Sequence, residues 1–327
     1  MFVKIFRKNY HFLLILLFVY GVLLWLKAFI YPALPDVSVT AGWLYKWIHP
    51  TLLEYPYLST ITAYGLLFLQ AVLLNNLVTK HALSEKVTYL PAFMYITLMS
   101  LWPSYTMMHK LLIAHFFILL AVDKLLNIYS LENIRKHIFD IGILLSVASL
   151  FYVYAAYYIL FVWISLLLYK TYSIRLWLIS IAGFILPYIF IVFYFFWTDN
   201  LTPFLELVHL PALQQFDLNW GKFSVWAAIM LQIVLLISAV KYKLLDKERN
   251  VMLRKYASIL MGFYSFTIIS LMWVSDLFVH MPALFIPTAV FFSTFLLNVK
   301  KKWVGELLVL AIVILALINH FLMPFSG

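Results

Sequence analysis

The sequence predicts an all-α, polytopic transmembrane helix bundle with about eleven spans. Of its 327 residues, 65% are hydrophobic and only 11% are charged, whereas a soluble domain carries about 25% charged residues. A soluble chain of this length could not bury so much apolar surface, which excludes a soluble enzyme, a disordered chain and a nucleic-acid-binding domain. The apolar residues also recur in runs of spanning length, and basic residues gather between alternate runs.

Eleven apolar segments can be read along the chain, because a helix needs about 20 such residues to cross a bilayer. In order they cover residues 11–30, 59–77, 89–102, 111–128, 138–152, 155–169, 176–197, 223–240, 257–273, 282–298 and 307–322. The third, fifth and sixth are short, so we expect them to tilt little or to lie partly buried in the bundle. The N-terminus starts like a signal peptide but lacks a small-residue cleavage site, which predicts a retained first helix.

The basic residues predict the orientation, because Lys and Arg concentrate in cytoplasmic loops. Nineteen of the 23 lie before the first segment, in every second loop after it or, for Lys124, near the inner end of the fourth segment. The N-terminus is therefore expected in the cytoplasm and the C-terminus outside, in a bacterial inner membrane. The net charge of +10 then reflects topology and attraction to anionic lipid. Four lysines fall outside this pattern, namely Lys27, Lys46, Lys110 and Lys222.

The chain is expected to form a single integral membrane domain over 1–327, with two long external loops at about 31–58 and 198–222. Both loops are rich in Trp, Leu, Tyr and Pro rather than in flexible polar residues. Apolar side chains recur in them at helical spacing, which predicts short interfacial helices that wall a cavity open toward lipid. These residues are Val39, Trp43, Trp47 and Ile48 in the first loop and Leu201, Phe204, Leu205 and Val208 in the second.

Asp36 is the candidate catalytic residue, because it follows the first span and is flanked by Pro35 and apolar residues. Desolvation there would raise the pKa of its carboxyl toward that of a general base. The alternative is that Asp36 caps the helix that contains Trp43, with Ser38 and Thr40 as rival caps.

Several other external residues are candidates for binding rather than for catalysis. His109 and Lys110 follow the tight outer turn at 102–104 and could hold a phosphate, or could cap the hairpin and contact lipid phosphate. His49 and Glu54 lie in the first external loop as further substrate-binding candidates. Glu206 and His209 are three residues apart and form a weak candidate for a zinc site. Cysteine is absent, and no nucleotide-binding or GxSxG pattern occurs, so no cofactor is expected.

Polar residues within the predicted spans are few. Asp123, Lys124 and Asp140 lie near the inner ends of spans four and five, where they can snorkel or pair with each other. Gln70 and Gln232 are amides, which more often fix helix packing than conduct ions. The absence of acids near the midplane and of a duplicated half weakens a transporter interpretation.

Two resemblances add to these predictions. The stretches LLNNLVTKHALSEKVTYLPAFMYITLMSLWPS (73–104) and LFYVYAAYYILFVWISLLL (150–168) resemble a family of polytopic Bacteroidota proteins of unknown function, sometimes labelled carotene monooxygenases. Over roughly the first 200 residues, the layout also resembles the C-type glycosyltransferases that use polyprenyl-phosphate sugars. In that group a catalytic acid follows the first span in an external loop, the place that Asp36 occupies here. The group's second acid is missing, because Val37 follows Asp36.

The second resemblance implies a glycosyltransferase-like protein that handles polyprenyl-phosphate-linked sugars at the outer leaflet. In that role Asp36 would deprotonate an acceptor hydroxyl, and His109 with Lys110 would hold the lipid phosphate. The partners would be membrane lipids, polyprenyl phosphate among them, and no nucleic acid. Two alternatives stay open: a non-enzymatic assembly or scaffold subunit of a cell-envelope complex, with protein partners, and a transporter.

Overall fold

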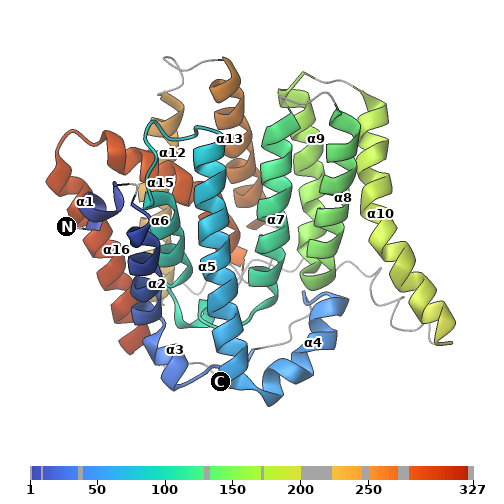
Figure 1. Cartoon of the computed structure of the whole chain (residues 1–327), viewed down its shortest axis with the longest axis horizontal. Helices are drawn as coiled ribbons and strands as arrows, with labels where there is room; N and C mark the ends of the chain where they lie inside the picture. The colour runs from blue at the N-terminus through green and yellow to red at the C-terminus, as the bar shows by residue number, and fades with distance from the viewer. Residues whose placement is uncertain are drawn as a thin grey trace. The chain divides into compact units, whose positions relative to one another are not determined.

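The computed structural model describes residues 2–8, 10–35, 40–128, 133–170, 173–199, 223–244, 251–271 and 280–322. Most of the residues in these ranges are helical, and none of them forms a β-strand (Figure 1). Side chains of α12 (Phe223–Leu244) are described for 232–242, and those of α16 (Lys302–Leu322) as far as residue 320. The described residues belong to two compact units.

Each of the eleven predicted segments contains a helix, which confirms the all-α class. Among the described residues, four helical stretches are long and apolar enough to cross a bilayer. These stretches are Pro56–Lys80, Ile174–Trp197, Met281–Asn298 and Lys302–His320. They mark the chain as a membrane protein, whereas the count of eleven spans and the orientation stay predictions.

The first unit covers 1–35, 55–108 and 215–327, and its centre is a pair of helices. Every residue of α6 (Leu90–Met99) is buried, and α15 (Phe285–Asn298) is buried along almost its whole length. A helix that is apolar all round belongs in an interior, and these two pack against each other. Around them lie α2 (Phe12–Leu24), α5 (Pro56–Lys80), α12, α13 (Val251–Leu271) and α16.

Polar contacts fix the helices around α6. The Tyr95 hydroxyl on α6 donates to Gln70 Oε1 on α5 at 2.6 Å, and both residues are fully buried. Tyr20 on α2 shares a 2.9 Å hydrogen bond with Thr97 on α6. Gln70 therefore joins two helices, as predicted for an intramembrane amide.

In the first unit, α16 is bonded to the N-terminal part of the chain at both of its ends. At one end, the Glu306 carboxylate on α16 accepts hydrogen bonds from the backbone N–H groups of Val3 (3.2 Å) and Lys4 (2.9 Å), which belong to α1 (Phe2–Phe6). At the other end, the Lys27 ammonium on α3 (Leu26–Ile30) donates to the backbone carbonyl of His320. The path from α1 through α3 and the path of α16 thus run in the same direction.

The second unit covers 36–54 and 109–214 and is organised around α8 (Ile134–Phe151). This helix packs between α7 (Lys110–Asn127) and α10 (Ile174–Trp197), and it also contacts α4 (Trp43–Glu54) and α9 (Tyr158–Leu168). The α10 ribbon bends part-way along its length (Figure 1), as expected for a helix with an internal proline, here Pro187.

Two glycines allow α8 and α10 to cross at close range. A β-carbon at Gly142 on α8 would overlap the carbonyl oxygen of Ser180 on α10, and one at Gly183 on α10 would overlap that of Phe139 on α8. Small residues at a crossing let backbones approach closely, which is a common way to associate helices in membranes. Near the crossing, the Trp163 indole on α9 stacks on Trp177 at 5.4 Å and donates to Ser180 Oγ at 2.9 Å.

The segment that leads into α4 is fastened to the C-terminal end of α8. Gly42 N–H donates to the Phe151 carbonyl at 2.9 Å, and Val153 N–H donates to the Thr40 carbonyl at 3.2 Å. A β-carbon on Gly42 would overlap the Leu150 carbonyl, so only glycine fits there. The helix predicted around Trp43 and Trp47 is therefore present as α4, and its start is held by backbone hydrogen bonds.

Candidate functional site

The predicted phosphate-binding pair lies at the start of α7. His109 is the N-cap residue, and its Nδ1 accepts a hydrogen bond from the Leu112 N–H at 2.9 Å. His109 thus caps the start of α7, which leaves both interpretations of the pair, phosphate binding and contact with lipid phosphate, as predictions. Burial, with the neighbouring Lys110 ammonium adding to it, lowers the pKa of His109 to about 3. The ring is then neutral, with its proton on Nε2, because Nδ1 is the acceptor.

Lys110 is the first residue of α7 and is only 5% exposed. Lysine is rarely buried to this degree. Lys110 also begins an 18-residue helix, at the end where the backbone dipole is positive. Both charges favour an anion, so the arrangement is suited to binding a phosphate oxygen.

The other two described candidates, His49 and Glu54, lie on α4. His49 is half-buried, and its ring lies 6.0 Å from the ring of Tyr45, which is fully buried. Glu54 is exposed and ends the helix. Trp47 is 69% exposed, as a residue at the headgroup level of a membrane would be.

The starts of α7 and α4 lie at the same end of the second unit. The Phe117 ring on α7 stacks on Phe151, the last residue of α8, with centroids 5.9 Å apart and planes 9° from parallel. The segment before α4 is bonded to that same end of α8, and Figure 1 shows both starts there. The structure therefore brings the two described pairs, one on α4 and one at α7, to one end of the unit.

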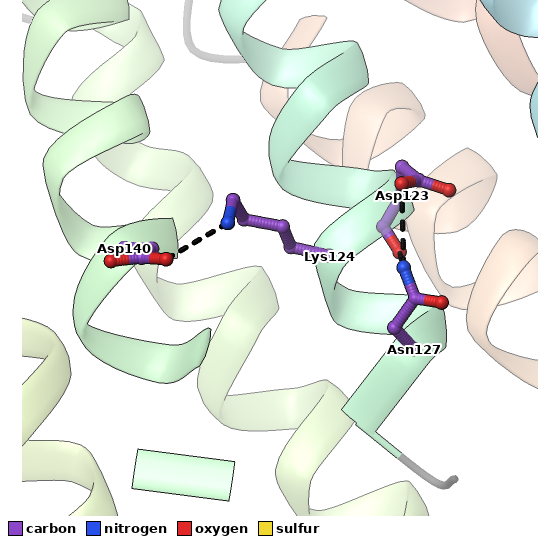
Figure 2. A network of polar contacts seen from close by, with 4 residues as sticks. All are labelled: Asp123, Lys124, Asn127 and Asp140. Atoms are coloured by element: carbon purple, nitrogen blue, oxygen red, sulfur yellow. Dashed lines mark hydrogen bonds and ion pairs between the residues drawn. The ribbon is translucent and has the colours of Figure 1, made fainter. Parts of the chain in front are cut away.

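The opposite end of α7 carries an ion pair (Figure 2). The Lys124 ammonium lies 2.8 Å from Asp140 Oδ2 on α8, which confirms the prediction that these residues can pair. Asp123 accepts hydrogen bonds from Asn127 Nδ2 through its backbone carbonyl (2.8 Å) and its carboxylate (3.3 Å). The side chains of Lys124 and Asp140 are about one-third exposed, and they are separated from Lys110 by most of the helix.

Three predicted site residues lie outside the described part of the chain, as does the interfacial helix predicted around 201–208. The three residues are Asp36, Glu206 and His209. Among the described residues, no group of three or more His, Asp or Glu side chains gathers as a metal site would require. The zinc hypothesis therefore gains no support from the described residues.

One polar cluster of the first unit was not predicted from the sequence. It joins Lys27 to His320 and Ser100, which lie far apart along the chain. The one indication of this cluster in the sequence is that Lys27 is among the four lysines outside the cytoplasmic pattern. Of the three that are described, Lys27 belongs to this cluster, Lys110 starts α7, and Lys46 is exposed on α4.

Comparison with known proteins adds no assignment. No protein-family model, no curated protein and no solved structure matches this chain.

Proposed function

We propose that this membrane protein handles a polyprenyl-phosphate-linked sugar at the outer leaflet of a bacterial inner membrane, with the lipid phosphate held at the start of α7. The observation that carries the proposal is the buried Lys110 at the positive end of α7. A phosphate there would interact favourably with both the ammonium and the helix end. The Nε2–H of the neutral His109 would be a further donor.

The chemistry proposed for this site is sugar transfer. Asp36 would accept the proton of an acceptor hydroxyl, whose oxygen then bonds to the anomeric carbon of the sugar. The bond from that carbon to the lipid phosphate breaks, and the phosphate leaves with the electron pair. Lys110 would stabilise the charge that develops on the leaving phosphate. His49 and Glu54 on α4 would contact the sugar or the acceptor.

Binding can be tested separately from transfer. The full chain, purified in detergent, is titrated with undecaprenyl phosphate, and bound lipid is measured by native mass spectrometry. We expect Lys110→Met to bind about tenfold more weakly, because a charge-assisted hydrogen bond of about 1.4 kcal/mol is lost. Lys46→Gln is the matched control, since this lysine is exposed on α4 of the same unit. Equal binding by wild type and Lys110→Met would refute the site.

Transfer is tested in cells with Asp36→Asn. Loss of a sugar from envelope glycans, at a normal level of the protein, supports the enzyme. If Asp36→Asn still binds undecaprenyl phosphate and the glycans of cells that carry it are unchanged, sugar transfer by this protein is refuted and the assembly-subunit alternative is favoured.

A further inference from the structure

A second polar cluster, in the first unit, surrounds the end of α16. The His320 ring is 3% exposed, and its Nε2 lies 2.9 Å from the backbone carbonyl oxygen of Ser100. Next to it, Asn319 Nδ2 donates to the Leu101 carbonyl at 3.0 Å. Trp25 Nε1 donates to Ser100 Oγ at 2.9 Å. Two side chains of the last helix thus satisfy carbonyl groups just past the end of α6, which helix termini leave without intrahelical partners.

This geometry fixes what the His320 ring can still bind. A carbonyl oxygen only accepts, so Nε2 must carry a proton. In the neutral ring, Nδ1 is then a bare acceptor. Nδ1 is buried and has no hydrogen-bond partner, and a buried polar atom without a partner costs about 1–3 kcal/mol. A hydroxyl group is the kind of donor that would satisfy it.

Lys27 supplies a positive charge beside this acceptor, because its ammonium donates to the backbone carbonyl of the same His320. Lys27 itself is partly exposed, and neighbouring apolar side chains on α2 and α3 are exposed. Leu23 is 62%, Leu26 51% and Ile30 53% exposed. In a bilayer such side chains face lipid, so the ammonium can be approached from the membrane rather than through the bundle.

We propose that Lys27 and His320 form a binding site for a membrane phospholipid whose headgroup carries a hydroxyl beside its phosphate. The phosphate oxygen would accept from the Lys27 ammonium, and the headgroup hydroxyl would donate to His320 Nδ1. This proposal concerns the first unit and does not rest on the function proposed for α7.

The test uses three lipids that differ in one feature at a time. Phosphatidylglycerol has the phosphate charge and the hydroxyls, phosphatidylethanol has the charge without a headgroup hydroxyl, and phosphatidylcholine has no net charge. Each is titrated into the purified full chain, and bound lipid is measured by native mass spectrometry. We expect phosphatidylglycerol to bind about tenfold more tightly than phosphatidylethanol, and phosphatidylcholine to bind most weakly. Equal binding of the three lipids would overturn the proposal.

Variants test separately which residue recognises the phosphate and which recognises the headgroup hydroxyl. Lys27→Met should remove the preference for both anionic lipids. His320→Leu should remove only the preference for the hydroxyl, and His320→Gln should restore it, because an amide can donate to Ser100 and accept from the ligand. Lys301→Gln is the control, since it changes an exposed lysine that precedes the opposite end of α16. Unchanged lipid preferences in Lys27→Met would overturn the site even if the His320 variants do not fold.

Two further experiments distinguish a phospholipid from a free phosphate, and the Lys27–His320 site from the site proposed at α7. Glycerol 1-phosphate, a free phosphate with the same groups, should not compete with phosphatidylglycerol, and competition would overturn the assignment to a lipid. Lys110→Met should bind phosphatidylglycerol as wild type does, and Lys27→Met should bind undecaprenyl phosphate as wild type does. The failure of one proposal is therefore distinguishable from the failure of the other.

Discussion

The crossing of α8 and α10 allows a sharp test of the packing in the second unit. In Gly142→Ala, the new methyl group would overlap the Ser180 carbonyl and lie 2.9 Å from the backbone nitrogen of Phe184. Carbon contacts are favourable only at about 3.5–4.0 Å, so the two helices must separate. Opening a gap of about 0.5–1 Å already forfeits a quarter to a half of the dispersion energy of each contact.

The expected cost follows from two opposing effects. Alanine favours a helix by up to about 1 kcal/mol over glycine, whereas overpacking costs about 1–3 kcal/mol or more. The clash here is with backbone atoms, which cannot rotate away, so we expect a net destabilisation of about 1–2 kcal/mol. Thermal unfolding followed by intrinsic tryptophan fluorescence should show a midpoint lowered by a few degrees.

Gly65→Ala is the matched control for this experiment. Gly65 lies inside α5, and a β-carbon there would meet nothing within 4 Å. The same substitution should therefore leave the midpoint unchanged or raise it slightly. Gly183→Ala meets the same crossing from the other helix, so the double variant should lose less than the two single losses combined. Equal shifts of the midpoint in Gly142→Ala and Gly65→Ala would show that no clash forms at the crossing of α8 and α10.

Three further predictions follow from the described contacts. Glu306→Ala removes the acceptor of two backbone N–H groups of α1, so trypsin should cleave faster after Lys4. Glu54→Ala is the control: it removes an exposed carboxylate and should leave the rate of cleavage unchanged. Lys124→Met should cost less than about 1 kcal/mol, because the pair with Asp140 is about one-third exposed; a larger loss in thermal unfolding would contradict this. The pKa of His109 is about 3 when folded and 6.5 when exposed, so the unfolded chain takes up the proton first as pH falls. The free energy of unfolding of the wild type should thus decline from pH 6.5 toward 3 more than that of His109→Asn, a variant that retains a capping oxygen. Parallel curves of stability against pH for the two proteins would show that His109 does not titrate in this way.

The helices were predictable because their signal is local. A run of apolar residues identifies a helix in a membrane protein without knowledge of its neighbours, and α5, α7 and α10 begin within three residues of the predicted segments. The break at Trp25 between α2 and α3 was not predicted, because no proline or glycine marks it. Gly142 and Gly183 likewise look ordinary until the partner helix is known.

The candidate site was predictable only in part. The four off-pattern lysines drew attention to Lys110, and charge patterning suggested Lys124 with Asp140. The contact between Lys27 and His320 joins residues 293 positions apart, and a sequence pattern read in windows of one helix carries no information at that range. That His109 caps α7 through Nδ1 depends on the geometry of one ring nitrogen, which the sequence does not record.

The bonds between Glu306 and α1 also have a consequence for the order in which the protein is completed. Val3 and its acceptor are separated by 303 positions, so the N-terminal helix is synthesised long before the group that fastens it. At about 5–20 residues per second, the ribosome reaches Glu306 about 15–60 s later. During that interval α1 waits without this anchor, and a chain truncated before α16 never acquires it. Docking of α1 would thus indicate that translation had reached α16. A protease that cuts at an undocked α1 would remove copies without α16 first.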